Sequence, residues 1–292
     1  GVRLVGSEMC IRDRFNKALS LVSGDIIIRV DGHSKISKNY LSNCLNVLEK
    51  VDADCVGGPI ISIANTQIGQ AIMVAQSSKF GVGGVSFRKS NPKGKFVDTL
   101  AFGAYKRQVF EKIGGYDEHL IRNQDDEFNF RMIQNNMKIW LDPSIKSFYY
   151  TRSSFKKLFL QYFGYGLYKI RVFQKRKGFA SIRHLIPGAF VLGVILSIIL
   201  GLLIGDILPL LILFLPYLSV LIFGSFYDTF ISKDIPSVIK IKKPILLTLL
   251  PIAYITLHFS YGIGFLIGIF RFIDKWTNNE LYDINFDREN FI

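Results

Sequence analysis

Apolar residues are concentrated in the last third of the chain, whereas the first half alternates short apolar runs with polar turns. Three stretches contain no Lys, Arg, Asp or Glu, at residues 185–205, 207–227 and 244–270. Each is long enough for an α-helix to cross the hydrocarbon core of a bilayer, which takes about 20 residues. The pattern therefore predicts a transmembrane region of about three helices at residues 185–270. Prolines in the second stretch leave open whether it crosses fully.

Residues 15–150 show the alternation of strands and helices that is typical of an α/β domain. The β-branched run 25–30 predicts a strand, and a second strand over 54–63 is interrupted by a Gly-Gly-Pro sequence. Ser37 and Thr66 are suited to begin the helices that follow these strands, because their side-chain oxygens can accept from free backbone N–H groups. The other elements that the pattern predicts are extended chain at 96–105, helices at 108–113 and 124–135, and a strand at 138–141.

Basic charge is concentrated between these two regions. The chain carries a net charge of +13, and residues 152–184 contain nine Lys or Arg but no Asp or Glu. We therefore predict a basic juxtamembrane region at residues 151–184, with an apolar helical face that suits a helix on the membrane surface. Packing of this helix against the α/β domain is the alternative. Basic charge at this place favours anionic membrane lipids over nucleic acid as the partner.

The distribution of charge also predicts an orientation. The basic region and the basic loop between the second and third apolar stretches should both face the cytosol. The tail at residues 271–292 is rich in acids and is expected on the opposite side, after an odd number of crossings. We therefore expect a multi-pass protein of the bacterial inner (plasma) membrane whose α/β domain is cytoplasmic.

Candidate chemistry lies first at the end of the predicted strand 25–30. Asp31, Gly32 and His33 follow this strand directly, and ligands of open α/β sheets bind beyond the carboxyl ends of strands. Gly32 lets the backbone approach a ligand. Asp31 and His33, two positions apart on extended chain, can share a divalent cation. An ordinary turn with an exposed histidine is the alternative that this motif alone leaves open.

A second group of acids lies at the start of the predicted helix 124–135. Asp125, Asp126 and Glu127 occupy its first turn, where free N–H groups and the helix dipole stabilise carboxylates. Helix capping alone explains one or two of them. Because three adjacent carboxylates repel one another, their presence favours a catalytic or electrostatic role.

A series of short motifs follows in a fixed order along the chain. The series runs Asp31-Gly32-His33, Asp54-Cys55-Val56-Gly57-Gly58, Phe80-Gly81-Val82-Gly83-Gly84, Val97-Asp98-Thr99, Phe102-Gly103-Ala104, Gly115-Tyr116-Asp117-Glu118, 122–131, 161–166 and 258–262. In this order the chain resembles the family 2 glycosyltransferases, and within them the succinoglycan-type membrane glucosyltransferases.

The resemblance implies a GT-A-like, Rossmann-like domain that transfers a sugar from a nucleotide-diphosphate donor with inversion at the anomeric carbon. A UDP-hexose such as UDP-glucose is the expected donor. A lipid-linked saccharide or polysaccharide is the expected acceptor, in the synthesis of bacterial exopolysaccharide or cell-surface glycan. Residues 1–14 match nothing in the family's nucleotide-binding portion, so the domain is expected to be truncated at its N-terminus. The alternative is a catalytically defective, membrane-anchored scaffold that binds other polysaccharide-assembly proteins.

The resemblance also assigns roles to the two acidic motifs. Asp31 matches the first Asp of the family's metal motif, and His33 stands where a second Asp is usual. The two are expected to bind Mg²⁺ or Mn²⁺, and together with Gly32 they are expected to bind the donor diphosphate. Asp125 aligns with the general base that deprotonates the acceptor, and Asp126 is the alternative for that role.

A third expected contact with the donor comes from Gln161. It matches the first residue of the family's QxxRW motif, although Gly164 and Tyr165 replace Arg and Trp. This departure argues against a processive polymer synthase and leaves the diphosphate short of one cation. Three basic residues nearby are candidates to supply it: Arg152, Lys156 and Lys157.

Overall fold

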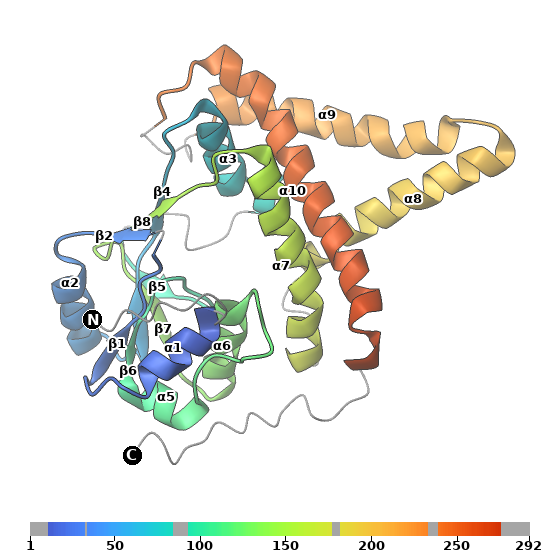
Figure 1. Cartoon of the computed structure of the whole chain (residues 1–292). Helices are drawn as coiled ribbons and strands as arrows, with labels where there is room; N and C mark the ends of the chain where they lie inside the picture. The colour runs from blue at the N-terminus through green and yellow to red at the C-terminus, as the bar shows by residue number, and fades with distance from the viewer. Residues whose placement is uncertain (1–10, 33, 84–92, 177–181, 233–238, 276–292) are drawn as a thin grey trace.

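The computed structural model describes residues 11–32, 34–83, 93–176, 182–232 and 239–275. They form an α/β domain built on two small sheets, followed by a helical region from which a hairpin of two helices projects (Figure 1). The fold class predicted from the sequence, an α/β domain followed by C-terminal helices long and apolar enough to span a membrane, is confirmed.

Two sheets form the centre of the α/β domain. The larger has five strands in the order β1-β6-β3-β7-β5, with β3 parallel to β7 and β6 antiparallel to both of its neighbours. The smaller has the order β2-β8-β4. The strands are β1 (Ile26–Ile28), β2 (Ser34–Ile36), β3 (Cys55–Gly57), β4 (Ile60–Ile63), β5 (Lys95–Phe96), β6 (Ala104–Lys106), β7 (Ile139–Leu141) and β8 (Ser147–Tyr150).

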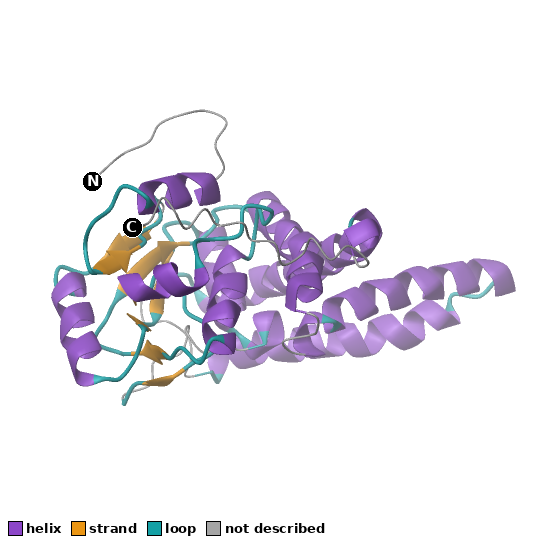
Figure 2. Ribbon diagram, turned by 90° about the horizontal axis from the view of Figure 1, so that it is seen from below, coloured by secondary structure: helices purple, strands orange, loops and turns teal. Residues whose placement is uncertain are grey.

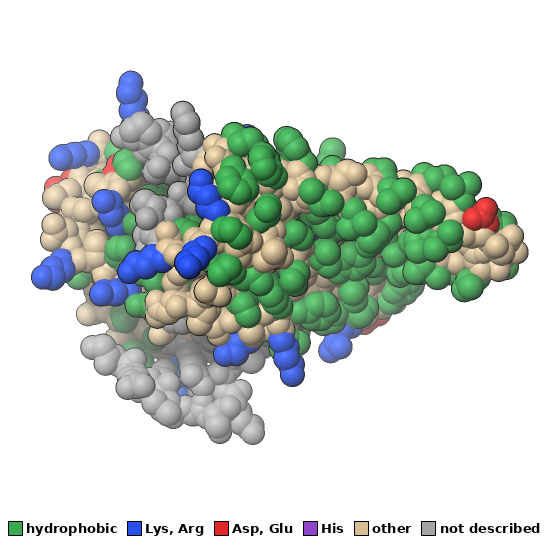
Figure 3. All heavy atoms as spheres, turned by 90° about the horizontal axis from the view of Figure 1, so that it is seen from above, with side chains coloured by type: hydrophobic (Ala, Val, Ile, Leu, Met, Phe, Trp, Pro, Cys, Tyr) green, Lys and Arg blue, Asp and Glu red, His purple; other side chains and the backbone are tan. Residues whose placement is uncertain are grey.

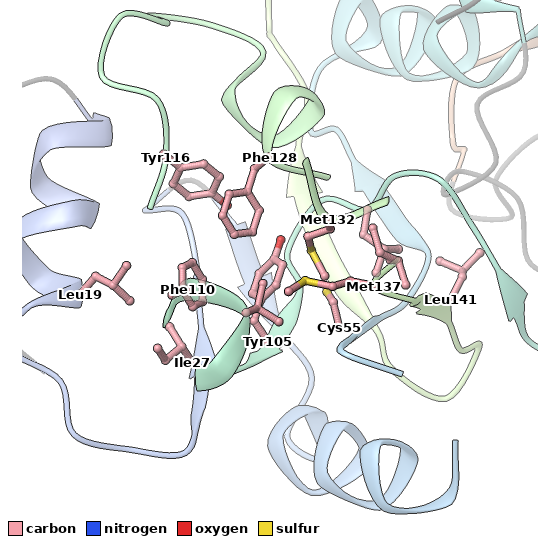
Figure 4. Close-up of a cluster of buried hydrophobic side chains, with 13 residues drawn as sticks. Leu19, Ile27, Cys55, Tyr105, Phe110, Tyr116, Phe128, Met132, Met137 and Leu141 are labelled. Atoms are coloured by element: carbon pink, nitrogen blue, oxygen red, sulfur yellow. The ribbon is translucent and has the colours of Figure 1, made fainter. Parts of the chain in front are cut away.

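Helices pack on both faces of the larger sheet (Figure 2). On one face, Leu19, Phe110 and Phe128 from three helices join Tyr105 of β6 in the main core (Figure 4). The rings of Phe110 and Phe128 stack with their centroids 5.2 Å apart. On the other face, Tyr40 belongs to a second buried cluster. The helices of this domain are α1 (Ile11–Leu19), α2 (Tyr40–Lys50), α5 (Arg107–Ile113) and α6 (Gln124–Gln134).

The strand predicted over residues 54–63 divides at its Gly-Gly-Pro sequence. The chain leaves the larger sheet after β3 and enters the smaller sheet at β4. A Cβ atom on Gly58 would lie 1.5 Å from the Ile145 carbonyl oxygen, so only glycine fits there. Helix α3 (Gln67–Ser77) and the short α4 (Lys79–Val82) follow. Thr66 begins α3 as predicted, since its Oγ1 accepts from the Gly69 N–H at 3.0 Å.

The prediction that Ser37 caps the next helix is wrong. Helix α2 begins at Tyr40, and Asn39 is the residue before it. The backbone N–H of Ser37 instead donates to the Lys146 carbonyl oxygen at 3.1 Å. This bond extends the pairing of β2 with β8, which the sequence pattern did not predict, and delays the start of the helix.

Three helices of the C-terminal region are long and apolar enough to cross a membrane, at Ile182–Ile204, Leu208–Phe230 and Lys243–Arg271. They confirm the three stretches identified in the sequence. Pro216 lies inside the second helix without ending it. The elements are η2 (Ile182–His184), α8 (Ile186–Ile204), α9 (Leu208–Phe230), α10 (Lys243–Arg271) and η3 (Ile273–Lys275).

Helix α7 (Phe155–Arg176) runs beside α10 along its length (Figure 1). The two backbones nearly touch at glycines. A Cβ atom on Gly166 would lie 2.1 Å from the Tyr261 carbonyl oxygen, and one on Gly264 would lie 2.2 Å from the Phe163 carbonyl oxygen. Small residues allow such close approach, so α7 and α10 form one closely packed pair.

Buried ion pairs join the second half of α7 to the α/β domain. Lys175 pairs with Asp117, which lies in the loop before α6. Lys169 Nζ lies 2.5 Å from Asp126 Oδ2, and Arg176 Nη2 lies 3.0 Å from Asp126 Oδ1. The three basic side chains are only 7–8% exposed. The sequence predicted that this basic stretch faces lipid headgroups, and for these residues the prediction is wrong.

Gly166→Ala should push α7 away from α10, because the new Cβ atom meets a backbone carbonyl. We expect a lower apparent melting temperature of the detergent-solubilised protein, measured by size-exclusion chromatography after heating. Gly164→Ala on the same helix is the matched control, because its Cβ atom would find its nearest neighbour at 3.6 Å, an ordinary contact. Alanine also favours a helix over glycine by about 1 kcal/mol. Equal losses in both variants would contradict the close packing.

Lys175→Met should lower the free energy of unfolding by about 3–5 kcal/mol, because it leaves the Asp117 carboxylate buried without its cation. Adding Asp117→Asn to this variant should recover much of the lost free energy of unfolding. Chemical denaturation of the two single variants and the double variant closes a thermodynamic cycle. Strictly additive losses would show that the two side chains are not coupled.

Candidate active site

β1 ends at Ile28, two residues earlier than the predicted strand, so Asp31 follows it after Arg29 and Val30. Its Oδ1 accepts a hydrogen bond from Arg29 Nε at 2.9 Å. The Arg29 guanidinium carbon lies 5.0 Å from the centroid of the Tyr116 ring. A Cβ atom on Gly32 would meet no atom within 4 Å, so there is open space beside the backbone here. The end of β1 therefore offers a carboxylate, a guanidinium group and room for a ligand.

The first turn of α6 is held against α7 by the residue that precedes it. Asn123 has a left-handed conformation with φ of 61°, and its Nδ2 donates to the Tyr165 carbonyl oxygen at 3.0 Å. Asp125 and Asp126 follow within this turn. Because consecutive residues of an α-helix point about 100° apart, the two carboxylates face different surroundings.

Asp125 shares its surroundings with Asp31, since Arg29 interacts electrostatically with both. Burial raises the pKa of Asp125 above its usual value. Arg29 opposes this shift, and the negative charges of Asp126 and Asp31 add to it. A carboxylate with a raised pKa is better suited to take up a proton than an ordinary one.

Asp126 is in a different electrostatic situation. Burial acts to raise its pKa, but Lys169 and Arg176 more than offset this effect and hold the pKa below its usual value. Its two carboxylate oxygens are engaged by these cations. The geometry therefore favours Asp125 as the proton acceptor and gives Asp126 a part in anchoring α7.

Glu127, the third acid of the turn, also has a structural partner. Arg131 Nε lies 2.6 Å from Glu127 Oε1, so its positive charge offsets part of the repulsion among the acids. The guanidinium group also donates to the carbonyl oxygens of Ile113, at 2.5 Å, and Gly115, at 2.7 Å. The pair thus ties α6 to the end of α5.

Gln161 is buried on α7, one helical turn before Tyr165. Its Nε2 donates to Tyr165 Oη at 2.9 Å and to Tyr149 Oη at 3.1 Å, and its Oε1 accepts from Arg152 Nε at 3.2 Å. Arg152 is thus the basic residue that contacts Gln161, whereas the other two candidates for the missing cation are exposed. Direct contact of Gln161 with a donor diphosphate stays a prediction.

The fit of a metal ion depends on few residues. His33 lies outside the described residues, and among those described no three His, Cys, Asp or Glu side chains form a metal cluster. Mg²⁺ bound with a diphosphate needs only one or two carboxylates, because phosphate and water oxygens complete its coordination. Asp31, with a side chain 23% exposed, offers one. Binding of a metal ion together with a donor therefore stays a prediction.

Three residues of this site were not singled out from the sequence: Arg29, Lys169 and Arg176. The spacing of residues in the sequence could have pointed to each of them. Arg29 stands two positions before Asp31, and residues at this spacing share one side of an extended segment. Lys169 and Arg176 are seven positions apart, which places them on one face of a helix. That face is otherwise rich in buried residues.

Comparison with known proteins finds two relatives. The dolichyl N-acetyl-alpha-D-glucosaminyl phosphate 3-beta-D-2,3-diacetamido-2,3-dideoxy-beta-D-glucuronosyltransferase of Methanococcus voltae is 30% identical over 263 residues, which cover 88% of this chain and 74% of the relative. The succinoglycan biosynthesis protein ExoA of Rhizobium meliloti is 28% identical over 163 residues, which cover 56% of this chain and 49% of the relative. No family model matches the chain.

The first of these relatives is similar over most of both chains, and the second carries the resemblance to succinoglycan-type proteins that the ordered motifs indicate. Asp31, beyond the end of β1, and Asp125, at the start of α6, lie close enough to interact electrostatically. The chain belongs to the family 2 glycosyltransferases.

Proposed function

We propose that the protein transfers a hexose, with inversion, from a nucleotide-diphosphate sugar such as UDP-glucose to a lipid-linked or polysaccharide acceptor. The reaction takes place at the cytoplasmic face of the bacterial inner membrane, in the synthesis of exopolysaccharide or cell-surface glycan. The observation that carries the proposal is the shared neighbourhood of Asp31, Arg29 and Asp125 beside the first turn of α6. The name of the Methanococcus voltae relative, a transferase for a dolichyl phosphate-linked sugar, supports the lipid-linked acceptor.

Asp125 acts as the general base in this proposal. The acceptor hydroxyl oxygen forms a bond to the anomeric carbon, the bond from that carbon to the diphosphate breaks, and Asp125 takes the proton of the hydroxyl group. Its raised pKa makes it a stronger base than an ordinary carboxylate. Asp126 stays ionised in its pairs with Lys169 and Arg176 and keeps α6 in place against α7.

The departing diphosphate gains negative charge, which positive groups must stabilise. Arg29 lies beside Asp31 and supplies a fixed cation in the neighbourhood. Asp31, with His33, would hold Mg²⁺ or Mn²⁺, which when bound neutralises charge on the donor diphosphate. The hydrogen bond from Arg152 to Gln161 supports Arg152 as the cation that the incomplete QxxRW motif leaves out.

The helical region supports an acceptor that resides in the membrane. Apolar side chains cover the projecting α8–α9 hairpin, whereas Lys and Arg side chains lie over the body of the protein (Figure 3). A bilayer around the hairpin brings the α/β domain next to the headgroups, where the saccharide of a lipid-linked acceptor would be presented.

Asp125→Asn should lower transfer by about 10²–10⁴-fold, because it removes the general base without changing the size of the side chain. The measurement uses membranes from cells that express the protein with any coding sequence preceding Gly1. These are incubated with radiolabelled UDP-glucose, Mn²⁺ and bacterial lipid, and the label in the organic extract is counted. Asp126→Asn is the matched control and should keep more transfer than Asp125→Asn.

Two outcomes of this assay would contradict the proposal. Full transfer by Asp125→Asn together with loss in Asp126→Asn would assign the base to Asp126. No transfer by the unaltered protein with any of a panel of nucleotide sugars would favour the scaffold alternative.

The pH dependence of transfer gives an independent check. A base must be ionised, so the rate should fall as the pH drops through the pKa of Asp125, which lies above that of an ordinary aspartate. Asp126→Asn removes a neighbouring negative charge, lowers the pKa of Asp125 and should move this acid limb to lower pH. An unchanged limb in kcat/KM profiles would mean that another group controls it.

A further inference from the structure

We propose that α10 does not cross the membrane, although it is long and apolar enough to do so. It lies in the membrane surface on the same side as the α/β domain, and its partner there is the headgroup and upper acyl region of the lipid leaflet. Of the helices that the structure describes, only α8 and α9 cross. The inference rests on packing and charge and does not depend on the proposed sugar transfer.

The first step of the argument is that α10 follows α7 from end to end. Between its second turn and its middle, Leu250 and Leu257 pack in one buried cluster with Leu158 of α7. Near its end, Phe265 packs with Phe173 of α7. Beyond its last turn, the Phe272 carbonyl oxygen accepts from Gln174 Nε2 of α7 at 2.7 Å. Whatever direction α7 takes through the molecule, α10 takes too.

The second step is that both ends of α7 lie against the α/β domain. The start of α7 follows β8 closely, and Gln161 donates to Tyr149 of that strand. The end of α7 is joined to the domain by Lys175 with Asp117 and by Arg176 with Asp126. The helix has 22 residues, so these anchors hold a segment of about 33 Å along the side of the domain.

A crossing α10 would carry its partner with it. The second half of α7, with Lys169, Arg171 and Lys175 buried, would enter the hydrocarbon together with the carboxylates that it binds. Each charged side chain at the bilayer centre costs about 2.5–3.5 kcal/mol or more. The α/β domain, with its charged surface and irregular loops, would have to follow. The pairing therefore excludes a membrane-spanning α10.

The surface of α10 fits a position in the plane of the membrane. Ile252, Ile267 and Phe270 are exposed along it, and they form an apolar face without a partner among the described residues. Basic residues stand at both ends, Lys243 at the start and Arg271 at the close, which suits contact with anionic headgroups at each end. A spanning helix would place one of these ends on the opposite side.

Helices α8 and α9, unlike α10, are mostly exposed. Of their apolar stretches only 11% and 17% are buried inside the protein, compared with 44% for α10. They project together away from the body, and their joining turn contains the exposed Asp206 (Figure 1). Lengths of about 28 and 35 Å allow each to cross a bilayer. The chain thus crosses twice, and Asp274 lies on the same side as the α/β domain.

Spin labels test the depth of each helix. Single cysteines replace the exposed residues Ile252, Ile267 and Phe270 of α10, and Ile186, Ile195 and Leu203 of α8 serve as the matched control set. In liposomes containing anionic lipid, power saturation measures the depth of each label. We expect the three α10 labels to lie within about one helix diameter, 10 Å, in depth, whereas depth changes steadily along α8. A steady change along α10, over about 27 Å from residue 252 to residue 270, would overturn the proposal.

Sidedness provides a second test with the complete chain in a bacterial host. In a Cys10→Ser background, Asp206→Cys should react with a membrane-impermeant maleimide in intact spheroplasts, and Asp274→Cys only after permeabilisation. The background without an added cysteine is the control, because Cys44 and Cys55 are buried. Labelling of Asp274→Cys in intact spheroplasts, or activity of alkaline phosphatase fused after Ile292, would overturn the proposal. So would failure to label Asp206→Cys before permeabilisation.

Discussion

The second half of α7 carries basic side chains inside the protein, and they are stable there because carboxylates of the α/β domain face them. Asp117 and Asp126 provide these carboxylates. A buried charge that loses its partner costs several kcal/mol, so the pairs fix where α7 lies relative to the domain. The glycines shared with α10 pass this constraint to the next helix. The position of the membrane-facing region therefore follows from ion pairs next to the candidate active site.

The same ion pairs help to explain why the pKa values of two neighbouring acids shift in opposite directions. Asp126 is engaged by Lys169 and Arg176, and its pKa is lowered. Asp125, one position earlier on the helix, is turned toward Arg29 and Asp31, and burial raises its pKa. Two carboxylates of one helical turn thus acquire different properties through the direction in which each points. In the proposed function, Asp126 anchors α7 and Asp125 supplies the base.

The regions of the chain with strong periodicity or long apolar runs could be predicted. The three apolar helices, α6 with its acidic first turn, and Thr66 at the start of α3 are as expected. The strands β2 and β8, which pair with each other across more than 100 residues of sequence, were not predicted. The prediction that Ser37 caps a helix failed because the backbone of Ser37 extends the pairing of these strands. Long-range pairing, which no local pattern reports, decided that segment.

By itself, the sequence determined the α/β class of the first half, the apolar helices, the acidic motifs and the family to which they belong. These features are local or ordered along the chain, so residue type and spacing report them directly. Only the tertiary structure decided that Asp31 and Asp125 share Arg29, and that the basic residues in the second half of α7 face inward. The sequence pattern of a charged helix surface is the same whether lipid headgroups or buried carboxylates neutralise its charge. The partner is set by contacts between residues some fifty positions apart, which exist only once the chain has folded.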